Sequence, residues 1–444
     1  MEDFTGKIKE FVIYLNENYG AEETRSVQSP MREIQLFSLF VGLFWNKNKR
    51  IRRIITYIIF IIVSVNFVFH TLLLVVTITT ILGLSVISQQ TYFVFCMYST
   101  FTGYLIINYF IYLTIKIHET KILSIMKVTY EPLYHYELDE GWGCTLDEGS
   151  SMFHRLMRYV LVIISVLPFM FICLVQRKEF VGEMDGIDSR LPFPLWYPVT
   201  INGGFTYYTF CIAQITLVLQ ANTVFSIALY VHVLAVNNLH KEYRRLIDSF
   251  SQVEIRAEKR YLKIRRHRLI ADRGSADLYR RTNFVKEVAA CLRDNLEHQS
   301  LIKRYLDVLN EIIDVPGVVG CTFISICMAF SMAIVTGTDR DILTKGFAFL
   351  LISVITLFGH CYFSSGQIVK DLSEELFICI NNFKWYQSDK RLTIYVKIML
   401  AGNIYPWNLK ACSMINCDME SFAGVLKKAY SYYNLLNVIR GRQS

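Results

Sequence analysis

The sequence predicts an all-α membrane protein with seven transmembrane helices. Residues 54–115 form a run of 62 positions without Asp, Glu, Lys or Arg, which is long enough for two spans of about 20 residues each. Four more charge-free runs predict spans three to six: residues 159–176, 191–240, 315–338 and 346–369. The apolar segment 421–439, interrupted only by Lys427 and Lys428, predicts the seventh span.

The loops between these runs predict the orientation. Alternate loops, beginning with residues 1–53, hold 37 Lys and Arg residues, whereas the intervening loops and the tail hold seven. Because basic loops stay in the cytoplasm, the N-terminus is expected inside the cell and the C-terminus outside it. This orientation, and the absence of an Asp-Arg-Tyr triplet at the third span, argues against a G-protein-coupled receptor.

Composition and motifs exclude several function classes. The net charge of +8 follows from the basic cytoplasmic loops, so no nucleic-acid partner is expected. The eleven cysteines show no disulfide framework or zinc spacing, and neither a metal nor a cofactor is expected. There is no His-Glu-x-x-His, Gly-x-Ser-x-Gly or phosphate-loop motif, so the chain is not expected to be an enzyme.

Three histidines, His70, His232 and His360, lie in or near predicted spans. No Asp or Glu shares those spans, so a proton relay is not expected, and we interpret the rings as neutral imidazoles bonded to a nearby carbonyl or hydroxyl. The same absence argues against an ion-coupled transporter. A sensor or a channel remains.

The chain divides at the predicted spans. We expect a cytoplasmic segment 1–53, spans one to four in 54–235, a cytoplasmic loop and helix 236–313, and spans five and six in 314–369. Association helices are expected in 370–412, and the seventh helix with an outer tail in 413–444. The outer loop 177–202 is rich in Pro and aromatic residues, which is consistent with either a lid over a pocket or an interfacial aromatic belt.

Two patterns point to a binding site and a pore. The outer halves of spans two, three and four are rich in aromatic and Met residues, which can enclose an apolar pocket with a polar group such as the Gln214 amide to orient a ligand. In the seventh span, Lys427, Tyr430, Asn434 and Asn437 recur at steps of three and four, so one helical face is polar. That face is expected to line water or to contact another subunit.

Several segments together resemble one family, the insect odorant receptors, over essentially the full chain. They are the Pro-rich and aromatic stretch 191–198 with 205–208, the helix 291–313 with His298, Gly359-His360-Cys361-Tyr362, Ser365-Gly366, Trp385, and the segment 422–433. The related gustatory receptors usually carry a later Gln-Phe in the last span, and Tyr432-Tyr433-Asn434 lacks that ending.

The resemblance implies a ligand-gated, nonselective cation channel in the plasma membrane of an olfactory sensory neuron. The chain would form a tetrameric hetero-oligomer with the shared odorant receptor co-receptor, would lie in contact with membrane lipid, and would bind a volatile small molecule. The pocket would lie among the outer halves of spans two, three, four and six, with these candidate residues: Tyr92, Phe95, Met170, Phe171, Tyr207, Tyr208, Cys211, Gln214, Phe347 and Leu351.

The resemblance also implies that the seventh span lines the pore, with Leu435 at a hydrophobic gate and Val438 and Ile439 at the outer constriction. Leu435 lies about 100° around the helix from Asn434, so we expect Leu435 and Val438 to face the pore, and Asn434 and Asn437 to face an adjoining subunit or the side of the pore. Two alternatives stay open: a gustatory-type channel that works without the co-receptor, and an inverted receptor that signals through a non-channel effector.

Overall fold

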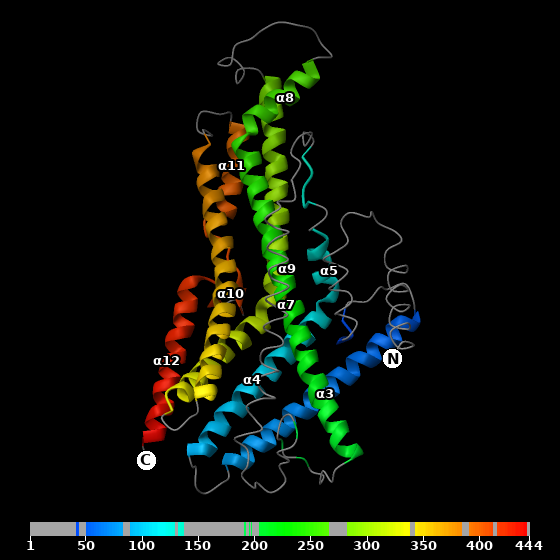
Figure 1. Ribbon diagram of the computed structural model, residues 1–444. Coiled ribbons are helices and arrows are strands. Elements are labelled where there is room, and N and C mark those ends of the chain that lie inside the picture. Colours follow the sequence, from blue (N-terminus) through cyan, green and yellow to red (C-terminus); the bar gives the residue numbers. More distant parts are fainter. Residues whose placement is uncertain are drawn as a thin grey trace.

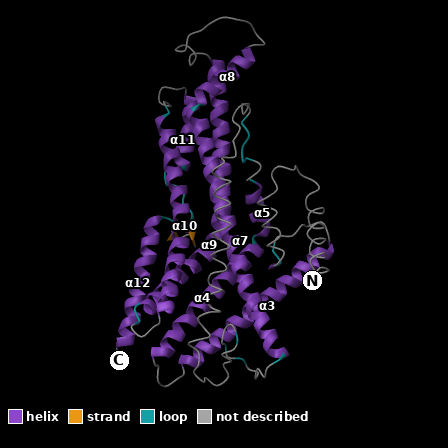
Figure 2. Cartoon of the chain, in the orientation of Figure 1, coloured by secondary structure: helices purple, strands orange, loops and turns teal. Residues whose placement is uncertain are grey.

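The computed structural model describes residues 41–43, 50–82, 89–128, 132–136, 191, 195, 197, 204–265, 282–337, 342–383, 390–411 and 415–441. Nearly all of these residues are helical, which confirms the predicted all-α class (Figures 1 and 2). The exception is a short antiparallel pair of strands, β1 (Lys410–Ala411) and β2 (Ile415–Asn416). The predicted third span, 159–176, lies outside the described residues.

Figure 1 shows the described helices as one elongated bundle. In chain order they are α3 (Arg50–Leu82), α4 (Gln89–Ile117), α5 (Glu119–Lys127), α7 (Phe205–Ser251), α8 (Val253–Arg265), α9 (Thr282–Val335), α10 (Ile342–Asn382), α11 (Lys390–Gly402) and α12 (Met419–Gly441). Helices α7, α9 and α10 run through most of the bundle, whereas α3 and α4 occupy one end of it and α8 and α11 the other.

Five of the described helices are long and apolar enough to cross a membrane. The segments are Ile54–Thr79, Tyr98–Ile117, Phe205–Ser251, Phe284–Val335 and Ala348–Asn382. They correspond to the predicted spans one, two, four, five and six. The predicted seventh span is the helix α12, which is long enough but is not among these five.

Helix α3 shows how the sequence suits a lipid environment. Large apolar side chains such as Ile58, Ile62, Val65 and Leu72 are exposed along it. Its opposite side buries Phe67, whose ring stacks on Tyr109 and Tyr112 of α4. A helix that is apolar both on its packed side and on its exposed side is typical of a span that contacts lipid.

The long helices connect two hydrophobic cores. Helices α3, α4, α5 and the first part of α7 share one core. The second part of α7 forms the other core with α8, α9, α10, α11 and the first turns of α12. With 54 residues, α9 is about 80 Å long. It contains Pro316, which lacks a backbone donor, and its yellow carboxyl-terminal part slants away from its upright amino-terminal part in Figure 1.

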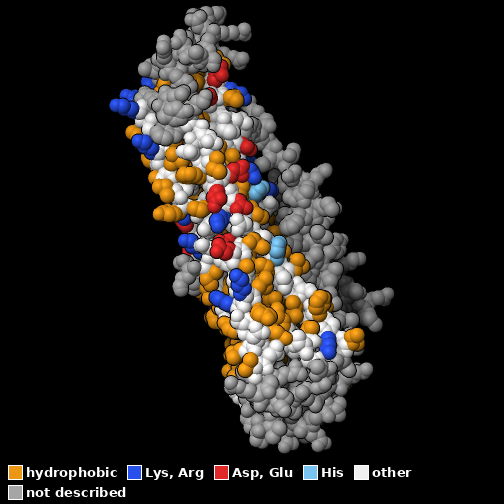
Figure 3. Space-filling model, turned by 90° about the vertical axis from the view of Figure 1, so that its left-hand side faces the viewer, with side chains coloured by type: hydrophobic (Ala, Val, Ile, Leu, Met, Phe, Trp, Pro, Cys, Tyr) orange, Lys and Arg blue, Asp and Glu red, His pale blue; other side chains and the backbone are white. Residues whose placement is uncertain are grey.

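The surface of the bundle changes character along its length. On the face shown in Figure 3, acidic side chains lie in the part nearer α11, whereas the other part carries hydrophobic side chains and a few Lys or Arg side chains. Apolar side chains are nevertheless exposed on α10 and α11, including Ile378, Ile394 and Ile398. These three isoleucines occupy positions where a helix packed only within this chain would carry polar residues.

Candidate functional site

An aromatic cluster joins α4, α7 and α9 near the ends that the sequence predicts to face outward. Phe95 of α4 packs edge-on against Phe330 of α9, with ring centroids 5.9 Å apart. Tyr98, one turn further along α4, is buried in the same core. Edge-to-face ring packing of this kind leaves a surface made almost entirely of aromatic carbon.

The first turns of α7 complete the cluster. Gly204, which precedes the helix, has φ = +76°, a conformation that favours glycine. Tyr207 and Cys211 are half-buried and pack against the core that contains Tyr98. Tyr208, in contrast, is 64% exposed.

Tyr197, which lies before α7 in the sequence, brings a polar contact to this cluster. The Gln214 amide is buried and donates a 2.8 Å hydrogen bond from Nε2 to the Tyr197 hydroxyl. The Tyr197 ring lies 4.4 Å from the Phe210 ring between centroids, and Leu191 and Leu195 are buried beside it. These three described residues of the segment before α7 therefore pack against the aromatic cluster.

The structure brings together four of the ten candidate ligand residues, namely Phe95, Tyr207, Cys211 and Gln214. Of the others, Tyr208 is exposed, and Leu351 is half-buried on α10 outside that core. Tyr92 and Phe347 lie on α4 and α10, but their side chains are outside the described ones, and Met170 and Phe171 are outside the described residues.

Several residues of the cluster, including Phe330 and Tyr197, are not among the ten candidates from the sequence. Phe330 belongs to the predicted fifth span, which the resemblance did not include in the pocket. Tyr197 was noted only as part of an aromatic outer loop. The pairing of the Tyr197 hydroxyl with Gln214 depends on how the loop folds back, and no sequence spacing encodes that contact.

Helix α12 carries the three candidate pore residues on its second half. Val425 and Ala429 are buried against the rest of the bundle, whereas Leu435 and Val438 are 58% and 54% exposed. Asn434 is also exposed, and the side chain of Ile439 is outside the described ones. In Figure 1, α12 lies at the edge of the bundle, so its exposed side is open to a neighbouring subunit.

Two of the three histidines noted in the sequence, His70 and His232, have the partners expected of them, whereas His360 is exposed on α10 and lies edge-on to the Phe422 ring, with ring centroids 6.4 Å apart. His70 Nδ1 lies 3.0 Å from the Asn66 carbonyl oxygen, and His232 Nε2 lies 2.8 Å from the Ser365 hydroxyl. Both bonds connect the imidazole to an uncharged group. Within the described part of the chain, no three His, Cys, Asp or Glu side chains gather in a way that could hold a metal ion.

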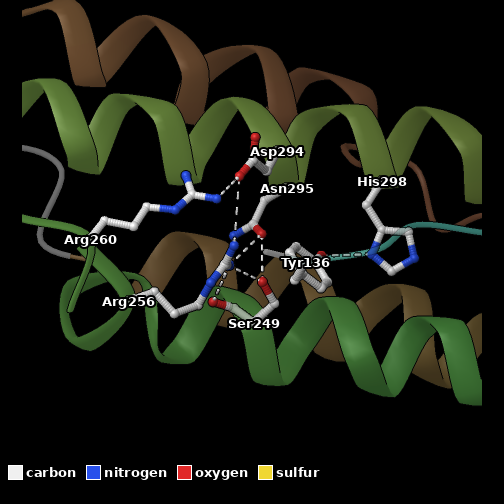
Figure 4. A network of polar contacts seen from close by, with 7 residues as sticks. All are labelled: Tyr136, Ser249, Arg256, Arg260, Asp294, Asn295 and His298. Carbon is white, nitrogen blue, oxygen red and sulfur yellow. Dashed lines mark hydrogen bonds and ion pairs between the residues drawn. The ribbon is translucent and has the colours of Figure 1, made fainter. Parts of the chain in front are cut away.

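A buried polar network ties the segment after α5 to α7, α8 and α9 (Figure 4). The Tyr136 hydroxyl lies 2.7 Å from His298 Nδ1, and His298 Nε2 lies 2.9 Å from Glu242 Oε2. The Arg256 guanidinium stacks over the Tyr136 ring at 4.4 Å.

Polar partners of the same network surround the two arginines. Arg256 bonds to Ser249 and to Asn295, and Arg260 donates a 2.7 Å bond to Asp294. Tyr134 stacks on His298, and burial raises the pKa of Tyr134 to about 12. Because the charges are paired and hydrogen-bonded, the network can hold these elements in one arrangement without an isolated buried charge.

Comparison with known proteins identifies similar chains. The family model described as 7tm Odorant receptor matches residues 146–430. Odorant receptor 33a of Drosophila melanogaster is 30% identical over 87 residues, which are 20% of this chain and 22% of that relative. Odorant receptor 33c of the same species is 26% identical over 155 residues, 34% of this chain and 40% of that relative.

Solved structures match the fold over nearly the whole chain. The insect olfactory receptor OR5 from Machilis hrabei in complex with eugenol matches with a TM-score of 0.68 and 10% identity, covering 92% of this chain and 98% of that one. The same receptor in a second structure gives a TM-score of 0.62 and 12% identity, with 91% and 97% coverage.

Proposed function

The chain belongs to the odorant receptor family, a family of multi-pass membrane proteins and not of enzymes, and we propose that it is the odorant-binding subunit of a ligand-gated, nonselective cation channel. The observation that carries this proposal is that the fold of an insect olfactory receptor extends over 92% of the chain.

The ligand that this cluster suits is a small, mainly apolar volatile molecule. Phe95, Phe330 and Tyr207 offer aromatic carbon, and the Tyr197–Gln214 pair offers one polar group for orientation. Burying the ligand surface against these rings would supply most of the binding free energy, at roughly 25 cal/mol per Å². The eugenol bound by the Machilis receptor is a ligand of that size and polarity.

The orientation follows the distribution of basic residues. With 37 Lys and Arg residues in one set of loops and seven in the other, the N-terminus lies in the cytoplasm and the C-terminus outside the cell. The aromatic cluster then faces outward, where an odorant arrives. The core that contains α8 and α11 then lies in the cytoplasm of an olfactory sensory neuron.

The channel forms with the odorant receptor co-receptor as a tetramer. A single α12 cannot enclose a pore, so conduction needs several subunits around an axis, with Leu435 and Val438 toward that axis. The exposed Ile378, Ile394 and Ile398 of α10 and α11 form the contact with the neighbouring subunit, since burying them would remove apolar surface from water.

Co-expression tests this function. Cells that carry the chain with the co-receptor should give inward current to some members of a broad volatile panel, and cells that carry either subunit alone should not give the same currents. Current to soluble tastants from this chain alone would instead favour a gustatory-type channel. Silence despite surface expression would count against the proposal.

A further inference from the structure

The signature segment of α10 that resembles the odorant receptors lies directly against the start of α12. A Cβ on Gly366 would overlap the Cys417 carbonyl oxygen, and a Cβ on Gly359 would be 2.6 Å from the Phe422 ring. Neither position has room for a side chain as the structure stands. The glycines therefore allow α10 to approach both the backbone before α12 and its first turn.

Polar contacts at the next turn of α10 hold the first turn of α12. The Met419 backbone N–H donates a 3.4 Å bond to Gln367 Oε1. Lys370 Nζ lies 3.7 Å from Asp418 Oδ2. Asp418 in turn caps α12, because its Oδ1 accepts a 2.9 Å bond from the Ser421 backbone N–H.

Asp418 thus both caps α12 and pairs with Lys370, and both contacts favour the ionised carboxylate. Burial alone would raise the pKa of this carboxyl, but the Ser421 hydrogen bonds and the charge of Lys370 together hold its pKa below the ordinary value. The carboxylate therefore stays charged at neutral pH. One charged side chain both satisfies the amino-terminal turn of α12 and pairs with α10.

A ring contact and a thiol hydrogen bond complete this connection. The Phe363 ring of α10 lies 5.3 Å from the Phe422 ring, and the Cys417 thiol donates a 3.4 Å hydrogen bond to the Tyr362 hydroxyl oxygen. Further along, α12 packs on α9, where the Ser325 hydroxyl bonds to the Val425 carbonyl oxygen. Helix α10 therefore contacts the start of α12, whereas the carboxyl-terminal half of α12 is largely exposed.

The other half of the same helix α10 reaches the core that contains the aromatic cluster at Ala348, which is buried there. Ala348 and Gly366 are 18 residues apart on one unbroken helix, which is about 27 Å. A shift or rotation of α10 at the ligand end is therefore passed along a rigid element to the start of α12.

We propose that the contact of Gly366, Gln367 and Lys370 with residues 417–419, here called the α10–α12 clamp, couples odorant binding to the pore helix. The inference rests on the proposed function. Lys370 and Asp418 are positioning residues: they touch neither odorant nor ion, and they set the tilt of α12, which carries Leu435.

Gly366→Ala tests the clamp, with Gly346→Ala as a matched control. Both glycines lie on α10, but a Cβ at Gly346 would meet nothing within 4 Å. At equal surface expression with the co-receptor, Gly366→Ala should reduce the maximal odorant-evoked current about tenfold, a typical size for coupling between sites. Gly346→Ala should leave the current unchanged. Equal currents from the two variants would overturn the proposal.

The Lys370–Asp418 pair gives a second test, and its melting-temperature readout does not depend on conduction. Lys370→Gln and Asp418→Asn, alone and together, are compared in melting temperature and in maximal current, with Lys397→Gln and Glu374→Gln as exposed single-charge controls. If the pair is coupled, the double variant should melt no lower than the worse single variant, and all three should conduct less than the controls.

The two tests separate the possible failures. If the wild-type chain reaches the surface with the co-receptor and gives no odorant current, the proposed function fails. The melting temperatures of the single and double charge variants then still test whether Lys370 and Asp418 interact. If the wild type conducts but the three charge variants conduct like the controls, the coupling role of the clamp fails. If the loss of melting temperature in the double variant equals the sum of the losses in Lys370→Gln and Asp418→Asn, the two residues are not coupled. The clamp is then refuted, whatever current the chain conducts.

Discussion

Replacing Tyr136 by Phe should destabilise the chain by removing one hydroxyl. That oxygen lies 2.7 Å from Nδ1 of His298, a side chain with no exposed surface, whose other ring nitrogen already faces Glu242. The phenyl ring of the variant would keep the stacking position under Arg256, so the substitution isolates the hydroxyl. A buried polar atom that loses its partner costs about 1–3 kcal/mol.

The assay is the melting temperature of the purified chain in detergent, measured as the temperature at which half of the folded protein is lost. A loss of about 1–3 kcal/mol corresponds to a fall of roughly 1–3 °C for a chain of 444 residues, because the entropy of unfolding grows with chain length. Tyr405→Phe is the matched control, because Tyr405 is 83% exposed. If the Tyr136 and Tyr405 variants melt at the same temperature, the network does not depend on this hydroxyl, and the reasoning is refuted.

Other substitutions follow from burial and charge. Phe363→Ala should cost about 3–5 kcal/mol because its ring is fully buried, whereas Phe349→Ala, at an exposed position of the same helix, should melt like the wild type. The pKa of Asp418 is lowered in the folded chain, so the carboxylate contributes its full stabilisation above the ordinary Asp pKa of about 4. This stabilisation is lost as the pH falls through the lowered pKa. Asp418→Asn should therefore lose less melting temperature than the wild type between about pH 5 and pH 3; an equal loss would contradict the assigned pKa direction. Ile394→Lys should leave the melting temperature unchanged but reduce the fraction of chain that co-purifies with the co-receptor; undiminished co-purification would exclude this face of α11 from the contact.

Much of the architecture could be predicted from the sequence because a membrane restricts it so strongly. Long charge-free runs must become helices, since an unpaired backbone group in lipid is costly. Five of the predicted spans therefore appear as long apolar helices. The family was also predictable, because the segments around Gly359, Gly366 and Phe422 are distinctive in their order.

The positions of side chains within the bundle were less predictable. Tyr208 and Gln214 both begin α7 and looked equally suited to a pocket, yet one is exposed and the other is buried against Tyr197. Which face of an all-apolar helix turns inward depends on its neighbours, and hydrophobic periodicity carries no signal when every face is apolar.

Contacts between distant segments were the least predictable. The Tyr136–His298 pair joins residues 162 positions apart, and the Lys370–Asp418 pair joins two elements separated by α11 and the strands. His298 and Gly366 were noted in the sequence as parts of family-like segments. Their physical roles, as part of a buried network and as the point where α10 approaches the backbone before α12, depend on the assembled structure.

The proposed function requires that one chain supply both odorant recognition and part of the pore. The most direct measurement compares Phe95→Ala and Leu435→Ala, each co-expressed with the co-receptor, for odorant ranking and for relative cation permeability. Phe95→Ala should change the ranking and leave permeability as in the wild type, whereas Leu435→Ala should change permeability and keep the ranking. If neither variant alters its own property while both reach the surface, this chain carries neither the pocket at Phe95 nor the gate at Leu435, and the claim is contradicted.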